Sequence, residues 1–344
     1  MVAHQNPPFR LPATDIELVL AAGGVNGFRH IGVLDELEAQ GIPLGTIHGV
    51  SVGAIVAAFY TNGYTPDQIT EIFLEALEDC KDPVTVLLAG WKEMSDELLK
   101  LAMEGSLKPD PGAFMESGWG SAVVRMTEAA TRFWHHGSSL QTFLSCLTLP
   151  DPLRVSIGGF VDLARPMRSM VERYNLRPQD NLNPIAADLF RQTLVSFRGK
   201  DHDLAHVLAS ACSLQRVFVP QWDHFEGGMR LLGDGATIHY SPAEFCRDSA
   251  IFSTFRPATE VPAEVKNWLY LFFTECEVHC PLAGNHRYVD QARHLVIETG
   301  DPDVAGLNFG LSAERCLKMR LDAQLTAREA LNRAREDGKL ANLR

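Results

Sequence analysis

The sequence lacks any long uninterrupted run of apolar residues. No run reaches the roughly 18 residues that a membrane-spanning helix requires, and the longest candidate, Trp268 to Phe273, is far too short. The N-terminal stretch MVAHQNPPFRLPATD has no apolar segment of the kind that a signal peptide contains. We therefore expect neither a leader nor a spanning helix. The expected location is cytoplasmic, with peripheral contact at membranes left open.

Cysteine is scarce and unpaired. The seven cysteines are odd in number, scattered, and include no C-x-x-C pair, which indicates a reducing compartment rather than a disulfide scaffold. Cys276, His279, Cys280 and His286 are residue types that bind zinc, but their spacing fits no standard structural site. The sequence therefore predicts neither a metal nor another cofactor.

Positive charge is also in deficit. The 344 residues include 31 Lys and Arg against 43 Asp and Glu, a formal net charge of −12. An acidic surface repels the phosphates of nucleic acids and anionic lipid headgroups, so nucleic acid is not an expected partner. The composition is otherwise that of a globular protein, with 46% hydrophobic residues.

What the sequence does contain is an alternation of strand and helix patterns. Apolar runs bounded by glycine and proline predict strands at 17–22, 42–49, 153–157, 183–187, 193–197, 230–232 and 294–298. Apolar spacings of three and four residues, with capping signals, predict helices at about 28–40, 54–60, 66–79, 203–213 and 313–334. Such alternation indicates an α/β fold with a mainly parallel sheet covered on both faces. Residues 81–148 are helical in pattern but less regular, and we expect a cap or insertion there.

The first candidate for chemistry is a G-x-S-x-G motif, Gly49-Val50-Ser51-Val52-Gly53, between a predicted strand and a predicted helix. Glycines on both sides allow a tight turn that presents the serine hydroxyl at the carboxyl edge of the sheet. The following helix N-terminus favours developing negative charge. This placement predicts that Ser51 is a nucleophile.

A second glycine-rich turn, Gly23 to Gly27, follows the first predicted strand. Its backbone amides favour an anion, either a phosphate or the oxyanion of an acyl-transfer intermediate. A dinucleotide site is disfavoured because Ala22 stands where that motif needs glycine, and a Walker A loop because no Gly-Lys-Ser/Thr follows.

A serine nucleophile needs a base, and the residues alone leave its identity open. The late histidines that a Ser-Asp-His triad would need are His239, His279, His286 and His294. The other candidate is Asp234, which lies between two glycines after a short apolar run. A plain turn aspartate would show the same pattern.

Together, the loop at Ala22 to Gly27, the motif at Gly49 to Gly53 and the late Asp234-Gly235-Ala236 resemble the patatin-like phospholipase family. The similarity extends over roughly 17–330. It implies a three-layer α/β/α patatin-like catalytic domain at 17–344, preceded by an N-terminal extension at 1–16.

The resemblance also implies a mechanism. Ser51 would be the nucleophile and Asp234 the general base of a dyad, without metal, in the hydrolysis of phospholipid or lysophospholipid esters through an acyl-serine. The motif residues implied are the oxyanion-hole amides of Gly23, Gly24 and Val25, and the glycines Gly27, Gly49, Gly53 and Gly235. The chain departs from the family at Ala22, which replaces a glycine, and at Asn26, which replaces a basic residue; Arg29 lies one helical turn further on.

Several alternatives stay open at this point. An acyltransferase or thioesterase would use the same acyl-serine, and a non-catalytic patatin-like regulatory module would keep the scaffold without turnover. The expected partner is a lipid or acyl-ester substrate. Peripheral membrane contact through the cap is left open, as is a homo-oligomer.

Overall fold

A computed structural model of the chain describes residues 15–79, 163–214, 218–225, 228–247, 249–255, 289–300, 304 and 306–340. The predicted helical insertion at 81–148 and strand at 153–157 lie outside these residues, as does the expected N-terminal extension up to residue 14. None of the described helices is long and apolar enough to cross a membrane.

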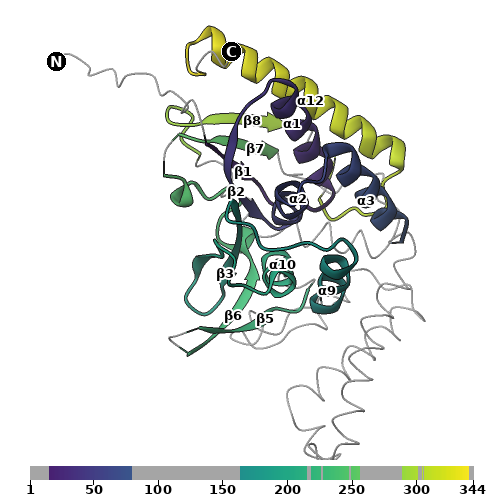
Figure 1. The fold of residues 1–344 in the computed structure, drawn as a ribbon, viewed down its shortest axis with the longest axis vertical. Coiled ribbons are helices and arrows are strands. Elements are labelled where there is room, and N and C mark those ends of the chain that lie inside the picture. Colours follow the sequence, from purple (N-terminus) through teal and green to yellow (C-terminus); the bar gives the residue numbers. More distant parts are fainter. Residues whose placement is uncertain are drawn as a thin grey trace, which may run out of the picture.

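A single eight-stranded sheet forms the centre of the described structure (Figure 1). Its strands are β1 (Ile16–Leu20), β2 (Leu44–Val50), β3 (Leu182–Asp188), β4 (Thr193–Ser196), β5 (Gln221–Phe225), β6 (Gly228–Asp234), β7 (Ile251–Phe255) and β8 (Leu295–Thr299). The order is β5-β6-β3-β2-β1-β7-β8, with β4 paired to β3. The five neighbouring strands β3, β2, β1, β7 and β8 are all parallel to one another. The pairs β3–β4, β3–β6 and β5–β6 are antiparallel. The predicted α/β fold with a mainly parallel sheet is confirmed.

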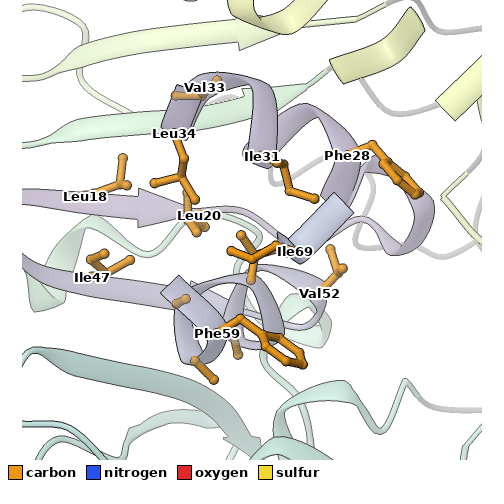
Figure 2. Close-up of a cluster of buried hydrophobic side chains, with 14 of the residues drawn as sticks. Leu18, Leu20, Phe28, Ile31, Val33, Leu34, Ile47, Val52, Phe59 and Ile69 are labelled. Atoms are coloured by element: carbon orange, nitrogen blue, oxygen red, sulfur yellow. The ribbon is translucent and has the colours of Figure 1, made fainter. Parts of the chain in front are cut away.

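The helices pack on one face of this sheet and share one hydrophobic cluster with it. They are α1 (Gly27–Ala39), α2 (Val52–Thr61), α3 (Pro66–Asp79), α9 (Ala164–Arg173), α10 (Leu204–Cys212) and α12 (Ala313–Glu336). Figure 2 shows Leu18 and Leu20 of β1 and Ile47 of β2 in this cluster with helical side chains such as Phe59. The other face carries Val19 and Phe252. Among the described residues, short 3-10 turns and loops lie on that face, and a second helical layer is not among them.

The turns η1 (Gly24–Asn26), η2 (Gly235–Thr237) and η3 (Ala243–Phe245) connect these elements. Capping side chains fix two helix starts. Ser312, a capping signal in the sequence, accepts from Arg315 N–H of α12, and Asp203, which the sequence pattern did not mark as a cap, accepts from two amides of α10. The helix α9 and the strands β5 and β7 are elements that the sequence reading missed.

Candidate active site

The structure places Ser51 on a sharp turn between β2 and α2. Its backbone lies at φ 53° and ψ −126°, a strained conformation for a residue with a side chain. The flanking glycines are required by close packing: a Cβ on Gly49 would lie 2.4 Å from Ala54 Cα, and one on Gly53 would lie 2.3 Å from Leu20 O. The predicted strand-to-helix turn is therefore present, with the hydroxyl at the carboxyl end of β2.

The order of the strands in the sheet brings Asp234 close to Ser51. The last residue of β2, Val50, pairs with Ile185 of β3, and Asp234 at the end of β6 pairs with Ala186, the next residue of β3. The ends of β2 and β6 thus flank the same point of β3. The Ser51 hydroxyl hydrogen-bonds with the Asp234 carboxyl group.

The Asp234 carboxyl group is almost fully buried, with 2% of the residue exposed. Burial raises the pKa of Asp234 to about 7, although the hydrogen bonds from Ser51 and from Ala236 N–H, the latter 2.9 Å long, act in the opposite direction. A carboxyl group with a pKa near neutrality can both take and return a proton under ordinary conditions.

The glycine loop ends β1 and carries backbone donors beside Ser51. Gly24 has φ +54°, and a Cβ there would lie 2.1 Å from Gly306 O. In the described part of the chain, neither Gly23 N–H nor Gly24 N–H has a hydrogen-bond partner. Val25 N–H, in contrast, donates to Gly306 O at 2.7 Å. The third amide expected for the oxyanion hole is therefore already engaged in this structure.

Asn26, which stands where the family has a basic residue, braces this loop. Its Nδ2 donates to Gly23 O at 3.2 Å, and Arg29 Nε donates to Asn26 Oδ1 at 3.0 Å. Both residues are only 3% exposed. The Arg29 guanidinium packs against Gly300, where a Cβ would lie 2.3 Å from Arg29 Cζ. Arg29 therefore lies behind the loop and does not present its charge to the cavity.

A narrow cavity of about 40 Å³ joins the nucleophile, the carboxyl group and the glycine loop. Its lining residues are Ala22, Gly23, Gly24, Ser51, Cys212, Leu214, Phe218, Asp234, Ala236, Tyr240, Gly306 and Leu307. Of the remaining motif glycines, Gly27 begins α1 and Gly235 begins η2, and neither is a lining residue of the cavity.

None of the described histidines lines this cavity. His239 accepts from Ser241 N–H. His294 accepts from Ala250 N–H and lies at the amino end of β8, whereas Ser51 lies at the carboxyl end of β2. His279 and His286 lie outside the described residues. The two described candidate histidines are therefore not placed beside Ser51.

Sequence reasoning missed two supports of the loop. The fully buried His30 hydrogen-bonds with Ala21 O and Ser253 Oγ, both at 2.8 Å, and burial lowers its pKa to about 4. Ala22 N–H donates to Tyr240 O. Ser253 and Tyr240 come from distant segments, so no local pattern marks these two contacts.

Comparison with known proteins shows the family of the chain. The family model described as patatin-like phospholipase matches residues 18–245, which include Ser51, Asp234 and the glycine loop. The chain belongs to the patatin-like phospholipase family.

Among the relatives of this patatin-like chain is lysophospholipase NTE1 of Saccharomyces cerevisiae, 45% identical over 65 residues that cover 18% of this chain and 4% of that protein. Patatin-like phospholipase domain-containing protein 6 of Mus musculus is 32% identical over 90 residues, covering 23% of this chain and 7% of that protein. The chain thus matches under a tenth of the length of either relative. Among solved structures, VipD of Legionella pneumophila aligns with 96% of this chain and 72% of its own at 14% identity and a TM-score of 0.42.

Proposed function

We propose that this patatin-like chain hydrolyses carboxylic esters of lipids, of the lysophospholipid or phospholipid class, through an acyl intermediate on Ser51. One observation carries the proposal: the Ser51 hydroxyl is hydrogen-bonded to the buried Asp234 carboxyl group, beside the unpartnered amides of Gly23 and Gly24. The names of the relatives support a lysophospholipid as the first substrate to test.

The proposed reaction proceeds in two halves. Ser51 Oγ attacks the ester carbonyl while its proton passes to Asp234, and the negative charge on the carbonyl oxygen is stabilised by Gly23 and Gly24 N–H. The C–O bond to the alcohol then breaks, and the alcohol leaves with the proton from Asp234. In the second half Asp234 takes a proton from water, the hydroxide adds to the acyl carbon, and Ser51 regains its proton as the acid leaves.

The oxyanion hole is assigned to Gly23 and Gly24 because their amides are unpartnered beside the cavity. Val25 could join them only if its bond to Gly306 opened, since a single N–H at 2.7 Å from one carbonyl is directed away from any other acceptor. Hydrolysis needs no metal in this scheme, since the proton acceptor and the oxyanion donors are all protein groups.

Covalent labelling tests the enzyme against the non-catalytic module. A fluorophosphonate probe should label the wild-type chain, and Ser51→Ala should abolish the labelling. An unlabelled wild-type chain, or equal labelling of the variant, would refute the proposal.

Once labelling is seen, p-nitrophenyl esters of graded length together with lysophospholipid and diacyl phospholipid give the substrate class. Product analysis with added alcohols or thiols as acceptors then separates hydrolysis from acyl transfer.

A further inference from the structure

A second group of side chains with metal-binding chemistry lies away from Ser51. Glu17 of β1, His48 of β2 and Cys246, which follows η3, each bring one ligand atom within 4.8 Å of the others. Glu17 Oε1 and His48 Nε2 are 3.6 Å apart. The three residues come from segments far apart in the sequence, so no spacing motif marks them.

These side chains are buried and incompletely satisfied. Glu17 is 5% exposed, His48 is fully buried and Cys246 is 9% exposed. Among the described residues, Glu17 Oε1 and His48 Nε2 have no hydrogen-bond partner, and these are the two atoms that face each other. Leaving two polar atoms buried without partners is costly, and native structures usually satisfy such atoms by a water or an ion.

We propose that Glu17, His48 and Cys246 bind one zinc-class divalent ion. A carboxylate, an imidazole and a thiolate are together a donor set that suits zinc. In tetrahedral zinc sites, ligand atoms lie roughly 3.3–3.8 Å from one another. The Glu17 to His48 distance of 3.6 Å already fits this range, and the thiol needs to approach by at most about 1 Å. The fourth position is left to a water molecule.

The surrounding groups are compatible with a metal. Asn183 Nδ2 lies 2.8 Å from His48 Nδ1 and can, with its amide turned, accept the Nδ1 proton while Nε2 binds the ion. Arg247 N–H donates to Glu17 Oε2, which leaves Oε1 as the ligand. The Arg247 guanidinium, with Nε 3.6 Å from Glu17 Oε1, has a side chain 68% exposed and can turn to solvent. Glu244 and Arg293 also act on Cys246 electrostatically, with opposite signs.

The position of the site indicates a stabilising role. Cys246 ends the segment that begins near Tyr240, whose carbonyl oxygen accepts from Ala22 N–H beside the glycine loop. An ion at Cys246 would tie this segment to β1 and β2. Because His48 does not line the catalytic cavity, the ion would act on the stability of the fold and not on the ester.

The test uses the full chain after treatment with a chelator. Added Zn²⁺ should bind in one equivalent and raise Tm, and Co²⁺ should give the near-ultraviolet absorption band of a thiolate-to-cobalt transition. Absence of that band in the wild-type chain overturns the proposal whether or not any variant folds, because the band requires a cysteine ligand.

Two cysteine variants provide the matched comparison, since Cys246 and Cys316 are both buried free thiols in the described structure. Cys246→Ala should abolish the cobalt band, whereas Cys316→Ala should retain it. Asn183→Ala should weaken zinc binding by about 10- to 100-fold. Equal binding by wild type and Cys246→Ala would place the ion elsewhere, for example among Cys276, His279, Cys280 and His286, and would overturn the assignment.

Discussion

At the scale of single residues, Asp234 shows how one environment serves chemistry at the expense of stability. Its carboxyl group is buried among backbone and apolar atoms, and only the Ser51 hydroxyl and Ala236 N–H favour its charged form. Asp188 lies on β3, two residues after Ala186, which pairs with Asp234. It has the opposite outcome: burial raises its pKa, but hydrogen bonds from Arg191 and Phe190 lower the pKa below its usual value. The two aspartates thus offer a matched pair.

The Asp234→Asn variant should lower turnover by at least about 10², because it removes the proton acceptor and keeps the shape of the side chain. Turnover with a p-nitrophenyl ester is the measurement. Wild-type activity in this variant, combined with loss of activity in a His239→Ala variant, would favour a triad instead.

The same variant should not be less stable than wild type at pH 8. The folded pKa of Asp234 is raised from 3.8 to about 7, so the native state favours the protonated form, and stability present at low pH is lost as pH rises through about 7. That loss amounts to at most about 4 kcal/mol. Asp234→Asn avoids it, whereas Asp188→Asn should lower Tm at pH 8. Thermal unfolding at about pH 5 and about pH 8 checks both, and an unfolding temperature of Asp234→Asn well below wild type at pH 8 would contradict the argument.

The pH dependence of activity follows from the same carboxyl group. Since Asp234 must be deprotonated to accept the Ser51 proton, kcat/KM should fall as pH drops through about 7. The profile should be measured with a substrate that does not itself titrate in this range. A flat profile between about pH 5 and pH 8 would exclude Asp234 as the base.

At the scale of elements, the loop from Gly23 to Asn26 is held by distant segments. Gly306 accepts from Val25 N–H, and Tyr240 accepts from Ala22 N–H, although neither segment is adjacent in sequence. The loop can therefore keep its amides directed at the cavity before any substrate arrives, which is the condition for effective oxyanion stabilisation.

Two glycines with similar backbone angles test this arrangement. Gly24 has φ +54° with Gly306 O in the way of a side chain, whereas Gly41 has φ +64° with nothing within 4 Å. Gly24→Ala should lower kcat/KM by about 10² or more by displacing the oxyanion donor. Gly41→Ala should keep the activity and lose about 1 kcal/mol of stability. Circular dichroism verifies folding, and an equal loss of activity in both variants would show that the effect is general strain.

Much of the element pattern could be predicted because its causes are local. The turn at Ser51 and the cap at Ser312 depend on neighbours within a few residues, and the sequence predicted both of them. The strand β7 (Ile251–Phe255), which borders β1 in the centre of the sheet, was missed. The bond from Val25 to Gly306, and the meeting of Glu17 with Cys246, depend on tertiary contacts that no spacing encodes.

At the scale of the whole molecule, the net charge of −12 affects which lipid surfaces the protein can approach. An acidic surface gains nothing from anionic headgroups and is repelled by them over about a Debye length, roughly 10 Å at 0.1 M salt. Hydrolysis should therefore be fastest on monomeric or zwitterionic micellar lipid.

The prediction is that increasing the anionic lipid content of vesicles will leave the rate unchanged or lower it, most visibly at low salt. The measurement is initial hydrolysis in vesicles of graded anionic content at two ionic strengths. A steep rise with anionic lipid would indicate a local basic surface that the overall charge conceals.

The sheet order also has a consequence for how this protein can be divided. The family match ends at residue 245, but two elements beyond that residue complete the fold around β1 and α1. The strand β7 borders β1 on one side in the middle of the sheet. The helix α12 covers α1, and Arg320 of α12 forms a bidentate ion pair with Asp35. A gene fragment cut at the end of the family match would leave β1 as an open edge able to pair with other chains. The range that the family model matches is therefore shorter than the range that completes the sheet. Any transplant of this site into another protein must carry β7, β8, the Gly306 segment and α12 with it.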